Sequence, residues 1–176
     1  MSIPADPAIA AALVRDLETP ADILAELAMS PLAFLREGVA THPNVTADVL
    51  DSLVQERLDP VTDLGLALAR AIARNTRTQS TTLAKIMGLL APDKRDGARR
   101  ENWPFEDLTA LVLTHRNCPE GEGAAFLKRA RLPRDLKARI ARNTASREIL
   151  EALKSKDSAT VQRAAALNLR APNDVQ

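Results

Sequence analysis

Three arginines stand just before an asparagine, at the end of a run of small residues: Arg74, Arg116 and Arg142. If the chain is built from stacked repeats, residues that occupy one position in each repeat form a line along the surface. Guanidinium groups in such a line bind phosphates or the carboxylates of an acidic peptide, because each planar fork donates two parallel hydrogen bonds. The alternative is that each arginine only stabilises a helix C-terminus through the helix dipole and stays solvated.

A second basic feature is the stretch 128–147. The stretch and its immediate neighbour contain only two acidic residues, Asp135 and Glu148. The eight cations are Lys128, Arg129, Arg131, Arg134, Lys137, Arg139, Arg142 and Arg147. We add Arg131, Arg134 and Arg139 to the arginine column as candidate contacts for an acidic protein partner. Nucleic acid is the alternative ligand, but we do not favour it, because the aromatic residues that stack on bases make up only 2% of the chain.

The charge of the chain is distributed unevenly, although the formal net charge is only +1. Residues 1–60 carry three arginines against ten acidic residues, a balance of −7, whereas residues 94–176 carry 17 cations against 11 acidic residues, a balance of +6. Opposite charge at the two ends is suited to head-to-tail self-association, which is a further interpretation of the same pattern.

Residue types that carry out catalysis or bind metal ions are few. The two histidines, His42 and His115, lie two repeat units apart and do not form a metal-binding pair with cysteine partners, and the single Cys118 excludes a cysteine-cluster site and an intrachain disulfide. Cys118 has His115 and Arg116 as neighbours, but we interpret it as a turn residue and not as a reactive thiol. With no phosphate-binding glycine loop or nucleophile motif either, we expect no catalytic residue, no cofactor and no metal.

These residues belong to a repeating pattern of small-residue runs that end at a polar residue. The five anchors are His42, Asn75, Asn117, Asn143 and Asn168, at intervals of 33, 42, 26 and 25 residues. Asparagine tolerates the left-handed conformation that ends many helices, and its amide can bond a free backbone group there. The hydroxyls of Thr46, Thr78 and Ser146 follow three or four residues later and are expected to cap the next helix.

The apolar residues that follow each cap recur at helical spacing, and no strand pattern is present. We therefore predict an all-α fold, a single domain over residues 1–176 made of about five two-helix repeats. Helices are expected at 5–18, 20–28, 31–41, 46–55, 60–74, 78–90, 104–116, 123–131, 133–142, 146–155 and 158–167. Residues 91–103 are charged and turn-rich, which indicates an insertion, and residues 120–123 are expected to form a further break.

The segments LREGVATHPNVTADVLDSL and LKSKDSATVQRAAALN resemble the bacterial variant leucine-rich repeat family. The resemblance implies a right-handed α-solenoid akin to HEAT and armadillo arrays. We expect a non-enzymatic scaffold that presents a helical surface to a protein partner, and the resemblance supports this function only at the level of the fold. An iron–sulphur cluster held by N-terminal cysteines occurs in that family and is not carried over, because this chain lacks those cysteines. A DNA-repair enzyme of the HEAT-like glycosylase kind is the remaining alternative, and the scarcity of aromatic residues argues against it.

The hydrophobic fraction of 45% and the charged fraction of 27% are ordinary for a soluble globular protein. No stretch approaches the roughly 20 apolar residues of a membrane span, and the N-terminus lacks the basic start of a secretory signal. These features together predict a cytoplasmic protein that does not contact membranes.

Overall fold

The computed structural model describes residues 6–58, 62–90, 105–130, 132–154 and 158–170, which form eleven helices and no strand. The fold class predicted from the sequence, all-α, is therefore confirmed for this part of the chain. The helices are α1 (Pro7–Arg15), α2 (Ala21–Ala28), α3 (Ala33–Thr41), α4 (Ala47–Arg57), α5 (Asp63–Arg74), α6 (Ser80–Leu90), α7 (Glu106–Thr114), α8 (Glu120–Arg129), α9 (Arg134–Asn143), α10 (Arg147–Lys154) and α11 (Ala159–Arg170).

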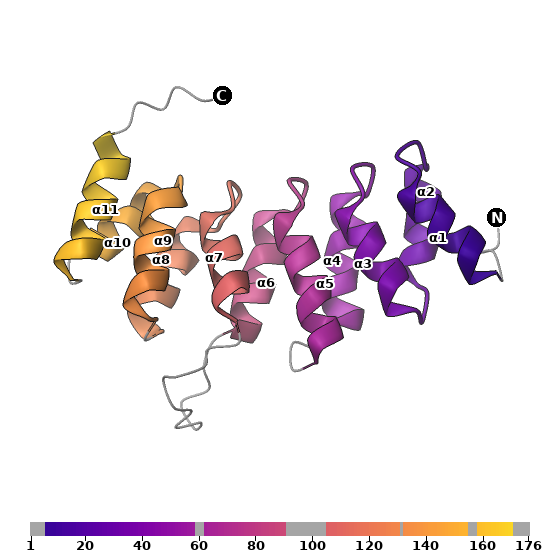
Figure 1. Ribbon diagram of the computed structural model, residues 1–176, viewed down its shortest axis with the longest axis horizontal. Coiled ribbons are helices and arrows are strands. Elements are labelled where there is room, and N and C mark those ends of the chain that lie inside the picture. Colours follow the sequence, from indigo (N-terminus) through magenta and orange to yellow (C-terminus); the bar gives the residue numbers. More distant parts are fainter. Residues whose placement is uncertain (1–5, 59–61, 91–104, 131, 155–157, 171–176) are drawn as a thin grey trace. The chain divides into compact units, whose positions relative to one another are not determined.

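The chain divides into two compact units, residues 1–86 and 87–176, with the boundary inside α6. Within the first unit, the odd-numbered helix α3 packs between α1 and α5, and α2 packs against α4 (Figure 1). Within the second unit, α9 packs between α7 and α11, and α8 packs against α10. Each unit therefore has one layer of odd-numbered helices and one layer of even-numbered helices.

The even layer of the first unit is joined by side chains of α4 and α6. Asp51 of α4 accepts hydrogen bonds from Lys85 Nζ at 2.8 Å and from Thr82 Oγ1 at 2.9 Å. The hydrogen bond from Lys85, assisted by that from Thr82, lowers the pKa of Asp51 from its usual value, although partial burial opposes the shift.

Small residues let the helices of a layer approach closely. The helix α5, DLGLALARAIAR, buries Leu68, Ala69, Ile72 and Ala73 with almost no exposed surface. Phe126 is the only described aromatic side chain that is buried in the core. The largest buried side chains are otherwise aliphatic, among them Leu24, Leu27, Leu35, Leu50, Leu53, Leu83, Ile86, Leu108, Leu113 and Ile140. This matches an aromatic-poor sequence that builds its core from leucine, isoleucine, valine and alanine.

The break expected at residues 120–123 is wrong, because these residues form the first turn of α8. Glu120 and Glu122 lie in that turn, where a carboxylate is favoured by the helix dipole. Gly123 is needed for packing, because a Cβ there would lie 2.9 Å from Cδ1 of Ile149 in α10. Gly123 therefore allows α8 to approach α10, whereas a Cβ at Gly121 would lie 3.8 Å from the nearest atom, Oε2 of Glu148. The insertion predicted at 91–103 lies outside the described residues.

Each odd-numbered helix from α1 to α9 ends at a polar residue that acts as a C-cap. The five caps are Asp16, His42, Asn75, His115 and Thr144. All are extended, with φ between −65° and −77°. In each, a side-chain acceptor takes the backbone N–H two residues ahead, at 2.9–3.2 Å. The side chain therefore satisfies a donor that the turn would otherwise leave unpaired.

Three of these caps also reach the preceding odd-numbered helix. His42 Nε2 lies 2.9 Å from the carbonyl oxygen of Asp16, and because His42 Nδ1 accepts the N–H of Asn44, Nε2 must carry the proton and donate. Asn75 Nδ2 donates to Ala40 O at 2.8 Å and to His42 O at 3.3 Å. These bonds fasten the end of one helix to the end of the helix stacked beside it.

The second unit repeats this arrangement. Thr144 Oγ1 donates to Leu113 O at 2.9 Å, which joins the end of α9 to the end of α7. Asn168 Nδ2 donates to Ala141 O at 2.8 Å and to Thr144 O at 2.9 Å, which joins α11 to the end of α9. Asn168 thus bonds as Asn75 does, although α11 continues past it to Arg170.

The anchor positions predicted from the sequence need three corrections. No described residue has the left-handed backbone that asparagine was expected to supply, because the caps turn the chain in an extended conformation. The cap after α7 is His115 and not Asn117, whose N–H bonds to the His115 ring. The cap after α9 is Thr144, whereas Asn143 donates from its exposed side chain to Arg139 O within its own helix.

The predicted hydroxyls lie in the turns and have different partners. Thr46 Oγ1 accepts from Val49 N at the start of α4, and Ser146 Oγ accepts from Ile149 N at the start of α10. Thr78 is fully buried two residues before α6, and its hydroxyl donates backwards to Ile72 O at 2.6 Å. Thr62, which the sequence analysis missed, caps α5 by accepting from Gly65 N.

The caps contribute unequally to stability, and the pair Asn75 and Asn143 tests this. We expect Asn75→Ala to lower the free energy of unfolding by about 1–3 kcal/mol, because the carbonyls at the end of α3 lose their partner. Asn143→Ala is expected to change it by less than about 0.5 kcal/mol, because that side chain is exposed and bonds locally. Urea denaturation of the two variants measures both, and equal losses would contradict the assignment of Thr144 as the cap.

The packing of α1 on α3 depends on Gly38, where an added Cβ would overlap Cγ1 of Val14. We expect Gly38→Ala to destabilise the protein by about 1–3 kcal/mol through overpacking. The double variant Gly38→Ala with Val14→Ala should recover part of the lost stability, because the overlapping methyl group is removed. The matched control is Gly88→Ala on the exposed side of α6, where the new methyl meets no atom. It should stabilise by up to about 1 kcal/mol through helix propensity. Thermal unfolding of these three variants and of Val14→Ala alone is the measurement, and additive losses in the double variant would refute the overlap.

Candidate functional site

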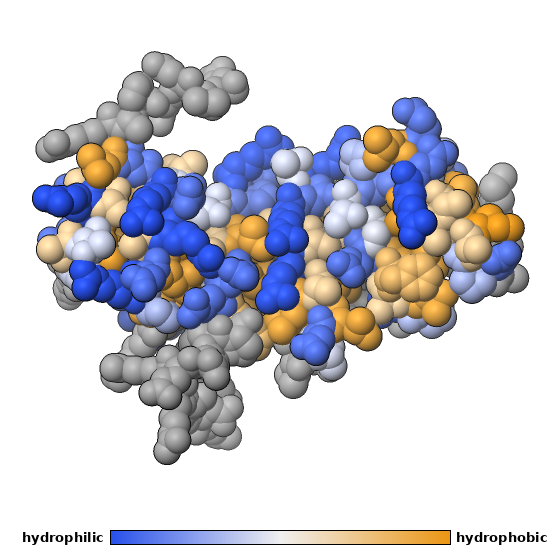
Figure 2. Space-filling view, viewed as in Figure 1, coloured by the Kyte–Doolittle hydropathy of each residue, from blue (hydrophilic) through white to orange (hydrophobic). Residues whose placement is uncertain are grey.

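The outer side of the odd layer in the second unit carries a group of exposed arginines. We call this the basic face, and it consists of Arg134, Arg139 and Arg142 of α9 together with Arg163 of α11. Hydrophilic side chains gather over α9 and α11 on the side of the molecule drawn in Figure 2. The exposed carboxylates on the described helices of this layer are Asp107 and Asp135, so positive charge predominates on the face.

The arginines of the basic face differ in how far neighbouring residues neutralise them. Arg139 Nη1 pairs with Asp107 Oδ1 at 3.0 Å, and its Nη2 donates to Glu106 O at 3.2 Å, so its guanidinium is tied to the start of α7. Arg134 donates to the hydroxyl of Thr160 in α11, a neutral acceptor that leaves its charge uncompensated.

Arg142 and Arg163 form no ion pair within the described residues. Both side chains are exposed, and both lie on the helices that carry Arg134 and Thr160. The basic face therefore presents three guanidinium groups to an anion, from Arg134, Arg142 and Arg163. Each can donate a bidentate, charge-assisted hydrogen bond to a carboxylate or phosphate.

The arginine column predicted from the sequence does not share one structural position. Arg74 is the last residue of α5, Arg116 lies in the turn after the cap His115, and Arg142 lies two residues before the cap Thr144. Since the column was aligned on Asn117 and Asn143, the two corrected anchors move its members apart. Arg142 stays a member of the basic face, and Arg74 belongs to the first unit. Arg131, also a predicted contact, lies outside the described residues.

Arg163 is a member of the basic face that the sequence analysis missed. It stands five residues before Asn168, as Arg70 stands five residues before Asn75 and Arg139 stands five residues before Thr144. The side chain at this position is partly buried at Arg70 and exposed at Arg139 and Arg163. The offset from the cap was the signal that could have identified Arg163.

The two histidines and the cysteine are engaged in structure. His42 is 2% exposed, and its ring bonds to Asn44 N in its own turn and to the carbonyl of Asp16 in the turn after α1. His115 accepts the N–H of Asn117 in the equivalent turn. Cys118 is a buried free thiol at the turn position held elsewhere by Thr19 and Thr78. The described residues contain no group of three or more His, Cys, Asp or Glu side chains placed to hold a metal ion.

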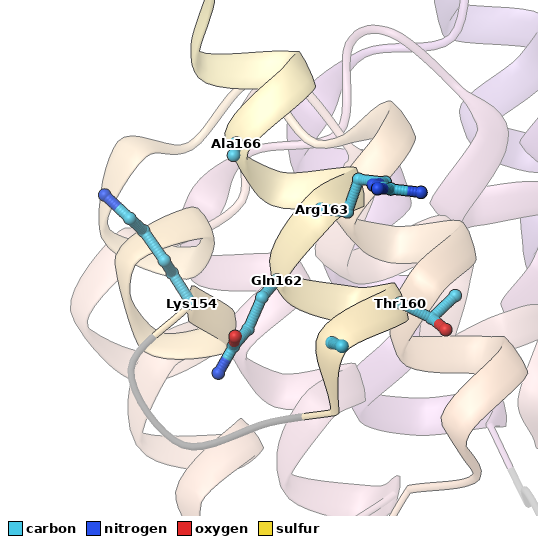
Figure 3. A pocket seen from close by; sticks show the side chains of 6 residues that line it. Lys154, Thr160, Gln162, Arg163 and Ala166 are labelled. Carbon is cyan, nitrogen blue, oxygen red and sulfur yellow. The ribbon is translucent and has the colours of Figure 1, made fainter.

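A shallow depression of about 770 Å³ lies against the outer side of α11. It is lined by Lys154, Ala159, Thr160, Gln162, Arg163 and Ala166. The polar side chains diverge, since Lys154 and Arg163 point to opposite sides of the helix in Figure 3. With no convergent set of donors, the depression does not form a small-molecule site.

No protein-family model matches the chain, and neither the curated proteins nor the solved structures contain a match. None of the helices in the described ranges has the length and apolar character needed to cross a bilayer.

The environment of Cys118 predicts its reactivity. Burial, reinforced by the carboxylates of Glu120 and Glu122, raises the pKa of its thiol from 9.0 to about 12. At pH 8 the folded protein should therefore hold about a thousandfold less thiolate than the unfolded chain. We expect iodoacetamide to modify Cys118 rapidly in denaturant and very slowly without it, as followed by mass spectrometry. Equal rates in both conditions would be inconsistent with the buried thiol.

The raised pKa of Cys118 also predicts how the stability of the fold depends on pH. The raised pKa favours the protonated thiol in the folded state, so this contribution to stability is complete below about pH 9. It is lost as the pH rises toward about 12, because the unfolded chain ionises first. Replacing Cys118 by serine, which does not titrate in this range, should remove the effect from the alkaline arm of a pH–stability curve.

Proposed function

We propose that the protein is a non-enzymatic helical-repeat scaffold that binds an acidic segment of a partner protein on the basic face. Its fold is proposed to be a right-handed α-solenoid in which five two-helix repeats, α2–α3 through α10–α11, follow α1. The similar cap turns and the separate odd and even layers support a repeat architecture. The resemblance to the variant leucine-rich repeat supports the handedness.

The observation that carries the proposal is the surplus of guanidinium groups on α9 and α11. The neutral acceptor of Arg134 and the absence of ion pairs at Arg142 and Arg163 in the described residues leave three charges for a partner. Arg139 contributes less net charge, because Asp107 pairs with it. Guanidinium forks on two adjacent helices are suited to a run of aspartate or glutamate side chains, since each fork can donate two hydrogen bonds to one carboxylate.

Nucleic acid is the second candidate for this face, and one observation weighs against it. The described phenylalanines lie at residues 34, 105 and 126, outside α9 and α11, so the basic face has no aromatic platform on which a base could stack. A DNA-repair enzyme is less favoured for the same reason. We place the protein in the cytoplasm, where its single free cysteine would remain reduced.

The basic face can be tested with a defined acidic probe. The triple variant Arg134→Glu, Arg142→Glu and Arg163→Glu should weaken binding of a fluorescent polyglutamate peptide by at least about tenfold. Fluorescence anisotropy over a series of salt concentrations measures the dissociation constant and its electrostatic part.

The matched control makes the same change in net charge on the even-numbered helices, through Lys128→Glu, Arg129→Glu and Arg147→Glu. The control variant should retain most of the affinity for the peptide. An equal loss of affinity in both triple variants would show that overall charge, and not the basic face, determines binding. Mixed-sequence DNA and RNA are titrated in parallel. If either binds more tightly than the peptide, the proposed ligand is nucleic acid and not an acidic protein. Dependence of the anisotropy on protein concentration alone would indicate self-association instead.

A further inference from the structure

The junction between α2 and α3 exposes large apolar side chains. Met29, Leu32 and Phe34 are 48%, 37% and 51% exposed within six residues of chain, and Leu64 at the start of α5 is 66% exposed. We call these four residues the apolar corner. The helices α3 and α5 pack against each other and begin at the same edge of the first unit, along which apolar side chains reach the surface (Figures 1 and 2). Exposed apolar residues that gather in this way mark interaction sites more often than scattered ones do.

Hydrogen bonds of Ser30 support the backbone of the corner. Ser30 is 4% exposed, and its hydroxyl accepts the N–H of Leu32 at 3.2 Å. Its carbonyl accepts from Arg36 Nη1 at 2.7 Å, and its own N–H donates to Leu27 O. Pro31 further restricts the backbone between Met29 and Leu32. Because these contacts already restrict the chain, it would lose little conformational entropy when a partner binds.

Among the described residues beside the corner, two exposed side chains are acidic. Glu37 lies one helical turn after Phe34, and Asp63 directly precedes Leu64. Both carboxylates are exposed, and neither forms an ion pair within the described residues. Arg36, the cation of this region of α3, is directed to the carbonyl of Ser30. The cations of α5, Arg70 and Arg74, lie in its C-terminal half, away from Leu64.

From this arrangement we propose that the apolar corner binds a basic amphipathic helix of a partner protein. Phe34 and Leu64 would contact the apolar face of that helix, and Glu37 and Asp63 would pair with lysines or arginines at its edges. A second copy of the chain is less suited to the corner, because a symmetric contact would bring the carboxylates of one copy against those of the other. An anionic lipid surface is disfavoured by the same two charges.

The surface is distinct from the basic face in position and in chemistry. It lies in the first unit and selects for positive charge, whereas the basic face lies in the second unit and selects for negative charge. The proposal therefore does not require the proposed function to hold.

The probe is a fluorescent designed helix with leucine on one face and lysine on the other. We expect Phe34→Ser with Leu64→Ser to weaken its binding at least about tenfold, as an aromatic and an aliphatic anchor are lost. Glu37→Lys with Asp63→Lys should weaken it at least several-fold and strengthen binding of a matched helix that carries glutamate in place of lysine. Fluorescence anisotropy gives the affinities, and circular dichroism with urea denaturation confirms that each variant folds.

The matched control is Leu17→Ser with Leu167→Ser, which removes two equally exposed leucines outside the corner. It should bind the lysine helix as the parent does, as should the triple arginine variant of the basic face. The proposal is overturned if a peptide of the same composition in scrambled order binds equally well. It is also overturned if the control loses as much affinity as the corner variant, or if the corner variant abolishes a dimer in sedimentation.

Discussion

The fold depends on the satisfaction of backbone polar groups at the turns that join each odd-numbered helix to the next even-numbered one. A helix end leaves carbonyls and N–H groups unpaired, and burying them without partners would cost far more than one hydrogen bond returns. A single cap side chain meets both needs at His42, Asn75 and Thr144: it accepts the N–H two residues ahead and donates to the end of the neighbouring helix. The same residue thus ends its own helix and positions it against the helix beside it.

This constraint explains which parts of the structure the sequence could predict. Helical spacing and the hydroxyls of Thr46 and Ser146 indicated the elements correctly, because local chemistry alone decides them. The cap column was misplaced by two residues at Asn117 and by one at Asn143, because the role needs an acceptor and a donor and not a particular residue type. Aspartate, histidine, asparagine and threonine all supply the acceptor. The shared Thr-His-x-Asn at 41–44 and 114–117 was the signal that could have identified His115 as a cap.

The error in the caps carried over to the candidate site. The column of Arg74, Arg116 and Arg142 depended on the alignment of the anchors, and it separated once the caps were known. The basic face does not depend on that alignment. It is defined by the exposure and ion pairing of arginines on α9 and α11, and sequence spacing reveals neither. The pairing of Arg139 with Asp107, 32 residues away, could not be foreseen from the chain alone. The molecule thus has one surface defined by unneutralised cations and another defined by exposed apolar groups, on separate units.

The turns that carry the caps have a nearly constant length, whereas one connection from an even-numbered to an odd-numbered helix is much longer. Residues 16–20, 42–46, 75–79 and 115–119 are four five-residue links, and only 144–146 is shorter. The links from even-numbered to odd-numbered helices range from four residues at 29–32 to fifteen at 91–105. An insertion in a cap turn would separate the cap side chain from the N–H group two residues ahead, whereas the connection between α6 and α7 already has fifteen residues. Grafted loops, affinity tags or fused domains should therefore be accommodated better in the connection between α6 and α7 than in any cap turn.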